Sequence, residues 1–84
     1  MSKSLEEELR DETLKWLQKI EKEIKKIEVN DEKGKEFFEN IKAYISDSHY
    51  FLNRDLIRAF ECVVWAWAWL EIGVRVGLLS VKEF

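Results

Sequence analysis

The chain holds one histidine, His49, and the acidic residue Asp47 lies two positions before it. Together with Glu61, these residues form the first candidate set for acid–base chemistry. General acid–base catalysis needs groups within hydrogen-bond distance of one another, and nothing in the sequence places a nucleophile beside His49. We therefore interpret His49 as a surface residue.

Cys62 is the only cysteine of the chain, so an internal disulfide is excluded. No base or cation that would activate its thiol is evident, and we interpret Cys62 as a small buried apolar residue. One histidine and one cysteine cannot supply a closed zinc site. We therefore predict no catalytic residue, no metal, no cofactor and no enzymatic activity.

Glu71 and Arg75 lie one helical turn apart near the end of an apolar segment. They could anchor a charged group of a ligand. The simpler interpretation is a structural ion pair within one helix, with Arg75 also favoured by the negative end of the helix dipole.

The segment from Leu56 to Gly77 carries three of the four tryptophans, and the rest of the chain must be arranged to cover it. Its W-A-W-A-W run alternates as a strand would, but the flanks keep helical spacing and no turn residue occurs before Gly73. We therefore predict a helix. Its core stripe is predicted to contain Leu56, Phe60, Val63, Trp67, Leu70 and Val74. The opposite side is predicted to carry Trp65, Trp69, Ile72 and Val76.

A helix that is apolar nearly all round is normally buried on several sides. In an 84-residue chain with no disulfide, part of that burial is expected to come from another molecule. We predict a homodimer that buries the four residues Trp65, Trp69, Ile72 and Val76. If the first helix packs on the flank of Ala59, Ala66 and Gly73, Trp69 would be half-buried within the monomer and Trp65 would remain the outward anchor.

Two further helices are expected. A capping-box pattern at Ser4 and Glu7 starts the first, a turn-forming stretch over residues 28–34 ends it, and Asp55 suits the N-cap of the third. The predicted helices span residues 3–28, 35–52 and 55–76. The fold class is all-α, an antiparallel three-helix bundle forming a single domain over residues 1–84, with a short tail after Gly77 that could fold back on the bundle.

The formal net charge of −3 gives no basic surface for nucleic acid, so no nucleic-acid partner is expected. The uninterrupted apolar run from Cys62 to Leu70 is far shorter than the roughly 20 residues of a membrane span, so no membrane partner is expected either. We predict a cytoplasmic protein. A composition rich in Lys and Glu and without proline is typical of a thermophile.

Two sequence patterns suggest a family. The first runs from Trp69 to Leu78 as W-L-E-x-G-x-R-x-G-L, and the second runs from Tyr44 to Phe51 as Y-x-x-D-S-x-Y-F. Together they resemble an archaeal family of small helical proteins, the domain-of-unknown-function family 357. The resemblance covers the second and third helices and implies a helical fold in archaeal cytoplasm, but it implies no activity and no site residues.

The leading functional hypothesis is a non-catalytic interaction or scaffold module that self-associates through its tryptophan-rich third helix. The alternative is a helical bundle that binds a small molecule or a peptide in a groove beside Trp65 and Trp69. Self-association would make the hydrodynamic size depend on concentration, whereas ligand binding predicts a monomer whose melting temperature responds to the ligand.

Overall fold

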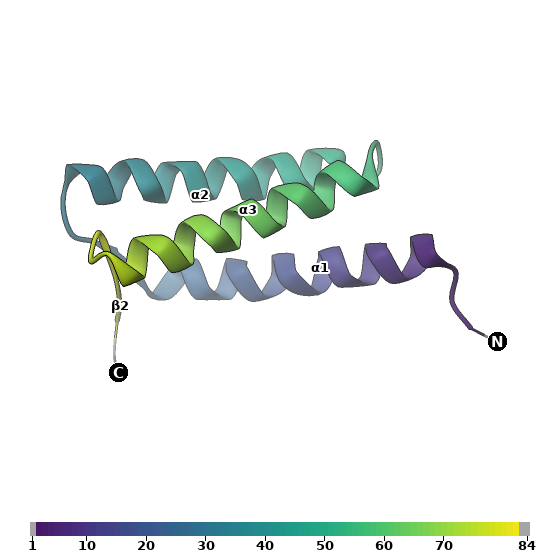
Figure 1. The fold of residues 1–84 in the computed structure, drawn as a ribbon, viewed down its shortest axis with the longest axis horizontal. Helices are drawn as coiled ribbons and strands as arrows, with labels where there is room; N and C mark the ends of the chain where they lie inside the picture. The colour runs from purple at the N-terminus through teal and green to yellow at the C-terminus, as the bar shows by residue number, and fades with distance from the viewer. Residues whose placement is uncertain (1, 83–84) are drawn as a thin grey trace.

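The computed structural model describes residues 2–82, which form three long helices lying side by side (Figure 1). Helix α1 spans Leu5–Glu23, α2 spans Glu32–Phe51 and α3 spans Leu56–Arg75. The chain direction reverses from α1 to α2 and again from α2 to α3, so α3 runs parallel to α1 and antiparallel to α2. The predicted all-α three-helix bundle is confirmed.

Each helix begins at a polar cap. The Glu7 N–H donates to Ser4 Oγ and the Ser4 N–H donates to the Glu7 carboxylate, which completes the predicted capping box of α1. Asp31 accepts from the N–H of Gly34 at the start of α2, and Asp55 accepts from the N–H of Arg58 at the start of α3. These side chains satisfy donors that have no partner within the helix.

Helix α3 ends at a glycine. Gly77 has a φ of 81°, and the N–H groups of Leu78 and Gly77 donate to the carbonyls of Gly73 and Val74. This pair of hydrogen bonds is the Schellman arrangement, which needs a left-handed residue that glycine adopts without strain. The chain therefore turns back sharply toward the bundle.

Beyond the turn, a two-stranded ribbon closes one end of the bundle. Strand β1 spans Ile27–Val29 and strand β2 spans Leu79–Val81, and they pair antiparallel with Val29 opposite Leu79. The predicted helix over residues 3–28 was therefore too long. It ends at Glu23, and a short 3₁₀ turn over Ile24–Lys26 leads into β1 because residues 27–29 gain a pairing partner that is distant in the sequence.

The second helix also differs from its prediction, because it begins at Glu32 and not at residue 35. Gly34, which looked like a turn residue, lies in its first turn and is buried. The expected tail folds back as predicted through Leu79, which is 1% exposed, while residues 83–84 lie outside the described part of the chain.

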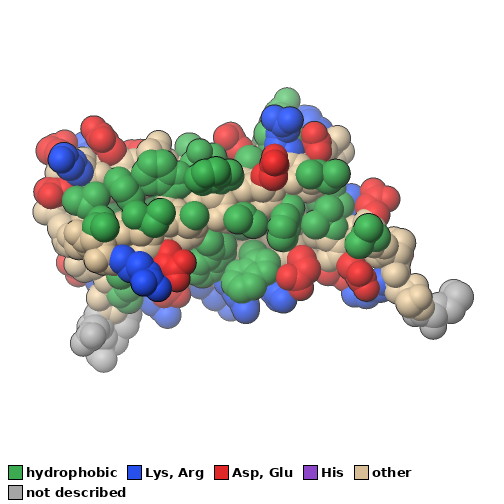
Figure 2. All heavy atoms as spheres, in the orientation of Figure 1, with side chains coloured by type: hydrophobic (Ala, Val, Ile, Leu, Met, Phe, Trp, Pro, Cys, Tyr) green, Lys and Arg blue, Asp and Glu red, His purple; other side chains and the backbone are tan. Residues whose placement is uncertain are grey.

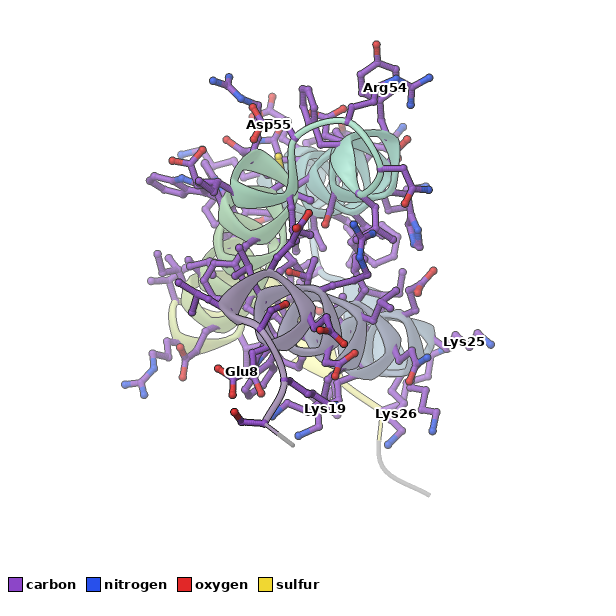
Figure 3. All side chains as sticks on the ribbon, turned by 90° about the vertical axis from the view of Figure 1, so that its right-hand side faces the viewer. Glu8, Lys19, Lys25, Lys26, Arg54 and Asp55 are labelled. Atoms are coloured by element: carbon purple, nitrogen blue, oxygen red, sulfur yellow. The ribbon has the colours of Figure 1, made fainter. Side chains whose placement is uncertain are left out.

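The core lies between the three helices and the ribbon. Its fully buried large side chains are Leu17, Ile20, Ile41, Val63 and Leu79. Viewed along the bundle in Figure 3, α1 lies against the α2–α3 pair, Arg54 and Asp55 mark the turn between α2 and α3, and Lys25 and Lys26 project away from the bundle. Glu8 and Lys19 of α1 also point away from the bundle in Figure 3, so charged side chains lie on the outside of this helix.

The predicted core stripe of α3 was correct at Val63 and Leu70 but was centred on the wrong residues. The buried residues of α3 are Ala59, Val63, Ala66, Leu70 and Gly73. Small side chains let α2 approach α3 closely, so the flank of alanine and glycine becomes the centre of the contact. A methyl group added at Gly73 would lie 2.6 Å from Leu79 Cδ1. Phe60 and Trp67 are consequently only partly buried, and Val74 is 36% exposed.

Candidate interaction surface

The titratable residues that could support catalysis do not meet. His49 points to α1, where its Nε2 lies 3.3 Å from Glu21 Oε2. Asp47 is two residues away on α2, which places it roughly 200° around the helix, and it lies instead near Cys62 together with Glu61. No acid–base set is assembled from these three candidates.

Cys62 is partly buried between α2 and α3. Burial raises the pKa of its thiol, and the negative charges of Asp47 and Glu61 raise it further, while Arg58 opposes them. A thiol in such surroundings is a poor nucleophile because the thiolate is the reactive form. Within residues 2–82, no three side chains of the types His, Cys, Asp and Glu are placed so that they could hold a metal ion.

The outer side of α3 carries the exposed apolar residues. Trp65 is 56% exposed, Ile72 is 50% exposed and Val76 is 61% exposed. Figure 2 shows hydrophobic side chains forming a band along α3 that a few charged side chains interrupt. Three of the four predicted interface residues, Trp65, Ile72 and Val76, are therefore at least half exposed in the monomer. We call these three residues the outer face of α3.

Trp65 is held in place although it is exposed. Its ring stacks on Tyr44 of α2, with centroids 6.3 Å apart and planes inclined by 18°. A large side chain that is already oriented loses little conformational entropy when a partner covers it, which favours its use in an interface.

Trp69, the remaining predicted interface residue, points toward α2. Its ring is half-buried and packs edge to face on Phe37, with centroids 4.6 Å apart. Its indole Nε1 is buried without a hydrogen-bond partner among the described residues. Most of the contact of Trp69 is therefore made within the chain, but the helix that packs on the small flank of α3 is α2 and not the first helix, as the prediction had assumed.

A groove of ≈ 750 Å³ runs between α1 and α3. Apolar side chains form most of its wall, including Trp16, Phe60, Val64, Trp67 and Val74, and Glu71 and Arg75 lie at its edge. The predicted groove beside Trp65 and Trp69 is therefore misplaced, because Trp69 fills the space between α2 and α3 and the hollow lies on the other side of the helix.

Two contacts fix the groove's wall. The Trp67 Nε1 donates to the carbonyl of Trp16 at 3.1 Å, and the two rings meet edge to face with centroids 5.7 Å apart. At the edge, Arg75 Nη2 lies 3.7 Å from Glu71 Oε1, and both side chains are more than two thirds exposed. An ion pair this exposed adds little stability.

The fold is that of a known family. The family model described as protein of unknown function (DUF357) matches residues 15–79, which is most of the chain. The chain belongs to the DUF357 family. The crystal structure of a DUF357 protein from Archaeoglobus fulgidus is 64% identical, with a TM-score of 0.86 over 94% of this chain and 100% of that one. No curated protein matches this chain.

Three residues of the DUF357 pattern, Ser48, Gly73 and Gly77, support the fold. Ser48 is buried and its hydroxyl donates to the Ala59 carbonyl at 2.7 Å, which ties α2 to α3. Gly73 allows Leu79 and Phe37 to pack on α3, and Gly77 forms the left-handed turn after the helix. These three roles are structural and assign no chemistry to the DUF357 protein.

Sequence reasoning missed the groove and the ribbon of this DUF357 protein. The alternation of Leu79, Ser80 and Val81 is too short to predict a strand from the sequence, and Val29 is an isolated apolar residue. The groove had no signal either because it depends on how far α1 and α3 stand apart. Among residues 2–82, no helix combines the length and the apolar character that a bilayer crossing requires.

Proposed function

We propose that this protein is a non-catalytic interaction module that self-associates as a homodimer through the outer face of α3. The observation that carries the proposal is the exposure of Trp65, which is 56% exposed although its ring is oriented by Tyr44. Tryptophan is enriched among the residues that dominate binding energies, particularly near the centre of an interface.

Its neighbours support the same use of this surface. Ile72 and Val76 follow Trp65 on the same side of the helix at spacings of seven and four residues, and each is at least half exposed. A contiguous apolar patch of this kind on a soluble protein is typical of an interaction site. A two-fold dimer covers such a patch simply, because the same surface meets its own copy.

Composition is consistent with a protein partner. The net charge of −3, with positive and negative side chains mixed, lacks the basic surface that a nucleic-acid partner would need. The proposal therefore includes no nucleic-acid partner. It also takes the protein to be cytoplasmic, without a membrane partner and without a cofactor.

The test is analytical ultracentrifugation of the wild type and of Trp65→Glu across a range of concentrations. The wild type is expected to sediment as a dimer and the variant as a folded monomer, with circular dichroism checking the fold. The matched control is Tyr50→Glu, which changes an aromatic residue that is 55% exposed near the far end of α2. A wild type that stays monomeric at about 100 μM, well above the dissociation constant of a stable dimer, would refute the proposal.

The groove between α1 and α3 supports a second function, binding of an apolar small molecule or peptide. Its volume of ≈ 750 Å³ lies in the range of ligand sites, and its wall is mostly apolar and aromatic. This function predicts a shift in melting temperature when a ligand is added to the wild type. The shift should be lost in Trp67→Ala and kept in Trp65→Ala, because only Trp67 lines the groove.

A further inference from the structure

Three residues of α3 are spaced by heptads along the side that faces away from the core. They are Glu61, Ala68 and Arg75. Residues seven apart on a helix are displaced by only about 20° around it, so the three lie nearly in line. Both charged residues are exposed and Ala68 is partly exposed between them, so this line is accessible to a partner and borders the outer face.

We propose that two copies pair through α3 in an antiparallel, two-fold arrangement whose axis passes beside Ala68, with Glu61 of each copy facing Arg75 of the other. The inference rests on the proposed self-association and specifies its geometry. The partner is a second copy of this chain because the charges on this face complement the same charges after a two-fold rotation.

The two charged residues are equally far from Ala68, and this spacing lets a two-fold rotation bring opposite charges together. Glu61 precedes Ala68 by seven residues and Arg75 follows it by seven, so each lies about 10.5 Å from Ala68 along the helix. A two-fold axis perpendicular to both helices at Ala68 therefore places each Glu61 beside an Arg75 of the second copy. The symmetric pair contains this contact twice.

The same two-fold axis also brings apolar residues of the two outer faces together. Trp65 lies three residues before Ala68 and Ile72 lies four residues after it, roughly 4.5 and 6 Å along the helix. Both lie on the same side of the Glu61–Arg75 line, so the rotation brings Trp65 of one copy over Ile72 of the other. The small side chain of Ala68 lets the two helices approach at the axis.

Three other pairings of the two α3 helices place like charges together. A parallel pair sets Glu61 against Glu61 and Arg75 against Arg75. An antiparallel pair with its axis at either charged residue does the same for that residue. Like charges held opposite each other across an interface oppose association. The axis at Ala68 pairs both charged residues of the line with opposite charges.

The contact of Arg75 with Glu71 in the monomer competes only weakly with a contact between Arg75 and Glu61 of the second copy. The two groups are 3.7 Å apart and their side chains are 77% and 70% exposed. The guanidinium has five N–H donors, so it can keep a contact with Glu71 and still donate to Glu61 of the second copy.

The test uses charge reversal and mixing. Glu61→Arg alone and Arg75→Glu alone each create repulsion twice per dimer and should weaken association by roughly ten-fold or more, since each exposed pair is worth up to about 1 kcal/mol. An equimolar mixture of the two variants should associate as tightly as the wild type, because every contact in the mixed dimer is complementary again. Sedimentation equilibrium measures all three.

The matched control reverses an exposed pair on α2, Glu39→Lys together with Lys42→Glu, whose side chains lie 3.5 Å apart. This swap should leave the dissociation constant unchanged. Circular dichroism checks that each variant is folded. Glu61→Gln, a milder change, should weaken association about two- to five-fold, since it removes the pair without adding repulsion.

The outcomes separate the two proposals. If the wild type is a monomer, both the proposed self-association and this dimer geometry are refuted. A wild-type dimer whose affinity is unaffected by either single reversal overturns only the geometry. The geometry is also overturned if the mixture associates no better than the single variants, and the self-association itself then stands.

Discussion

Replacement of Gly34 by alanine tests whether the close contact between α2 and the turn after α3 is correctly placed. Gly34 lies in the first turn of α2, and a Cβ at this position would overlap the carbonyl oxygen of Leu78. It would also lie 3.2 Å from the carbonyl carbon of Leu78 and 3.4 Å from Val29 Cγ1. The obstacle is backbone that cannot rotate away.

The sign of the change in stability shows whether the close contact at Gly34 outweighs the higher helix propensity of alanine. Alanine should stabilise a helical position relative to glycine by about 0.5–1 kcal/mol. Overpacking against fixed atoms costs about 1–3 kcal/mol. The Leu78 carbonyl also accepts the Asn30 N–H at 3.1 Å, so a shift of this turn strains the ribbon. Subtracting the propensity gain leaves about 0–2.5 kcal/mol. Because the obstacle is fixed backbone, we expect Gly34→Ala to lower the free energy of unfolding in the upper part of this range, by about 1–2 kcal/mol.

The assay is urea unfolding followed by circular dichroism, with wild type and variant at equal concentration because self-association would add to the apparent stability. The melting temperature should fall by about 5–15 °C for a domain of this size. Lys33→Ala, an exposed neighbour in the same turn, is the control and should change stability by less than about 0.5 kcal/mol. A Gly34→Ala protein as stable as the wild type would show that α2 does not approach the Leu78 turn so closely.

Two further predictions concern packing and reactivity. Leu70→Ala should destabilise the protein by about 2–5 kcal/mol because Leu70 is buried. Phe60→Ala should cost clearly less stability in the same urea titration because Phe60 lines the open groove. Equal losses would contradict the placement of Leu70 in the core and of Phe60 at the groove. Cys62 should react with iodoacetamide more slowly than free cysteine at pH 8, and its rate should rise at higher pH, because its raised pKa lowers the thiolate fraction. A rate matching that of the denatured chain would contradict this assignment.

Helix caps and helix number were predictable because they depend on neighbouring residues. Ser4 and Asp55 cap the helices that their positions predicted. Local rules gave no reason for the first helix to end at Glu23, since Ile24 and Ile27 continue its apolar spacing. The pairing of Ile27 with Val81 decides that end, and a contact so distant in the sequence has no local pattern.

The rotation of α3 was predicted less well than its existence. Large apolar residues were assigned to the core, yet Ala59, Ala66 and Gly73 occupy the centre of the buried face. Periodicity identifies an apolar helix but cannot choose a buried side when nearly every side is apolar. The close approach of α2 made that choice. Trp65 is exposed, as predicted, because its position on α3 lies well away from the buried side for either choice of core.

The ribbon has a consequence for the order of folding. Its strands are separated by residues 30–78, a stretch of 49 residues that includes both α2 and α3. Closing so long a loop costs entropy that neighbouring contacts must first offset. The α2–α3 hairpin brings the two strands together, so the ribbon should form after the hairpin. Because Leu79 enters the core from β2, the last step of folding would also seal the end of the bundle.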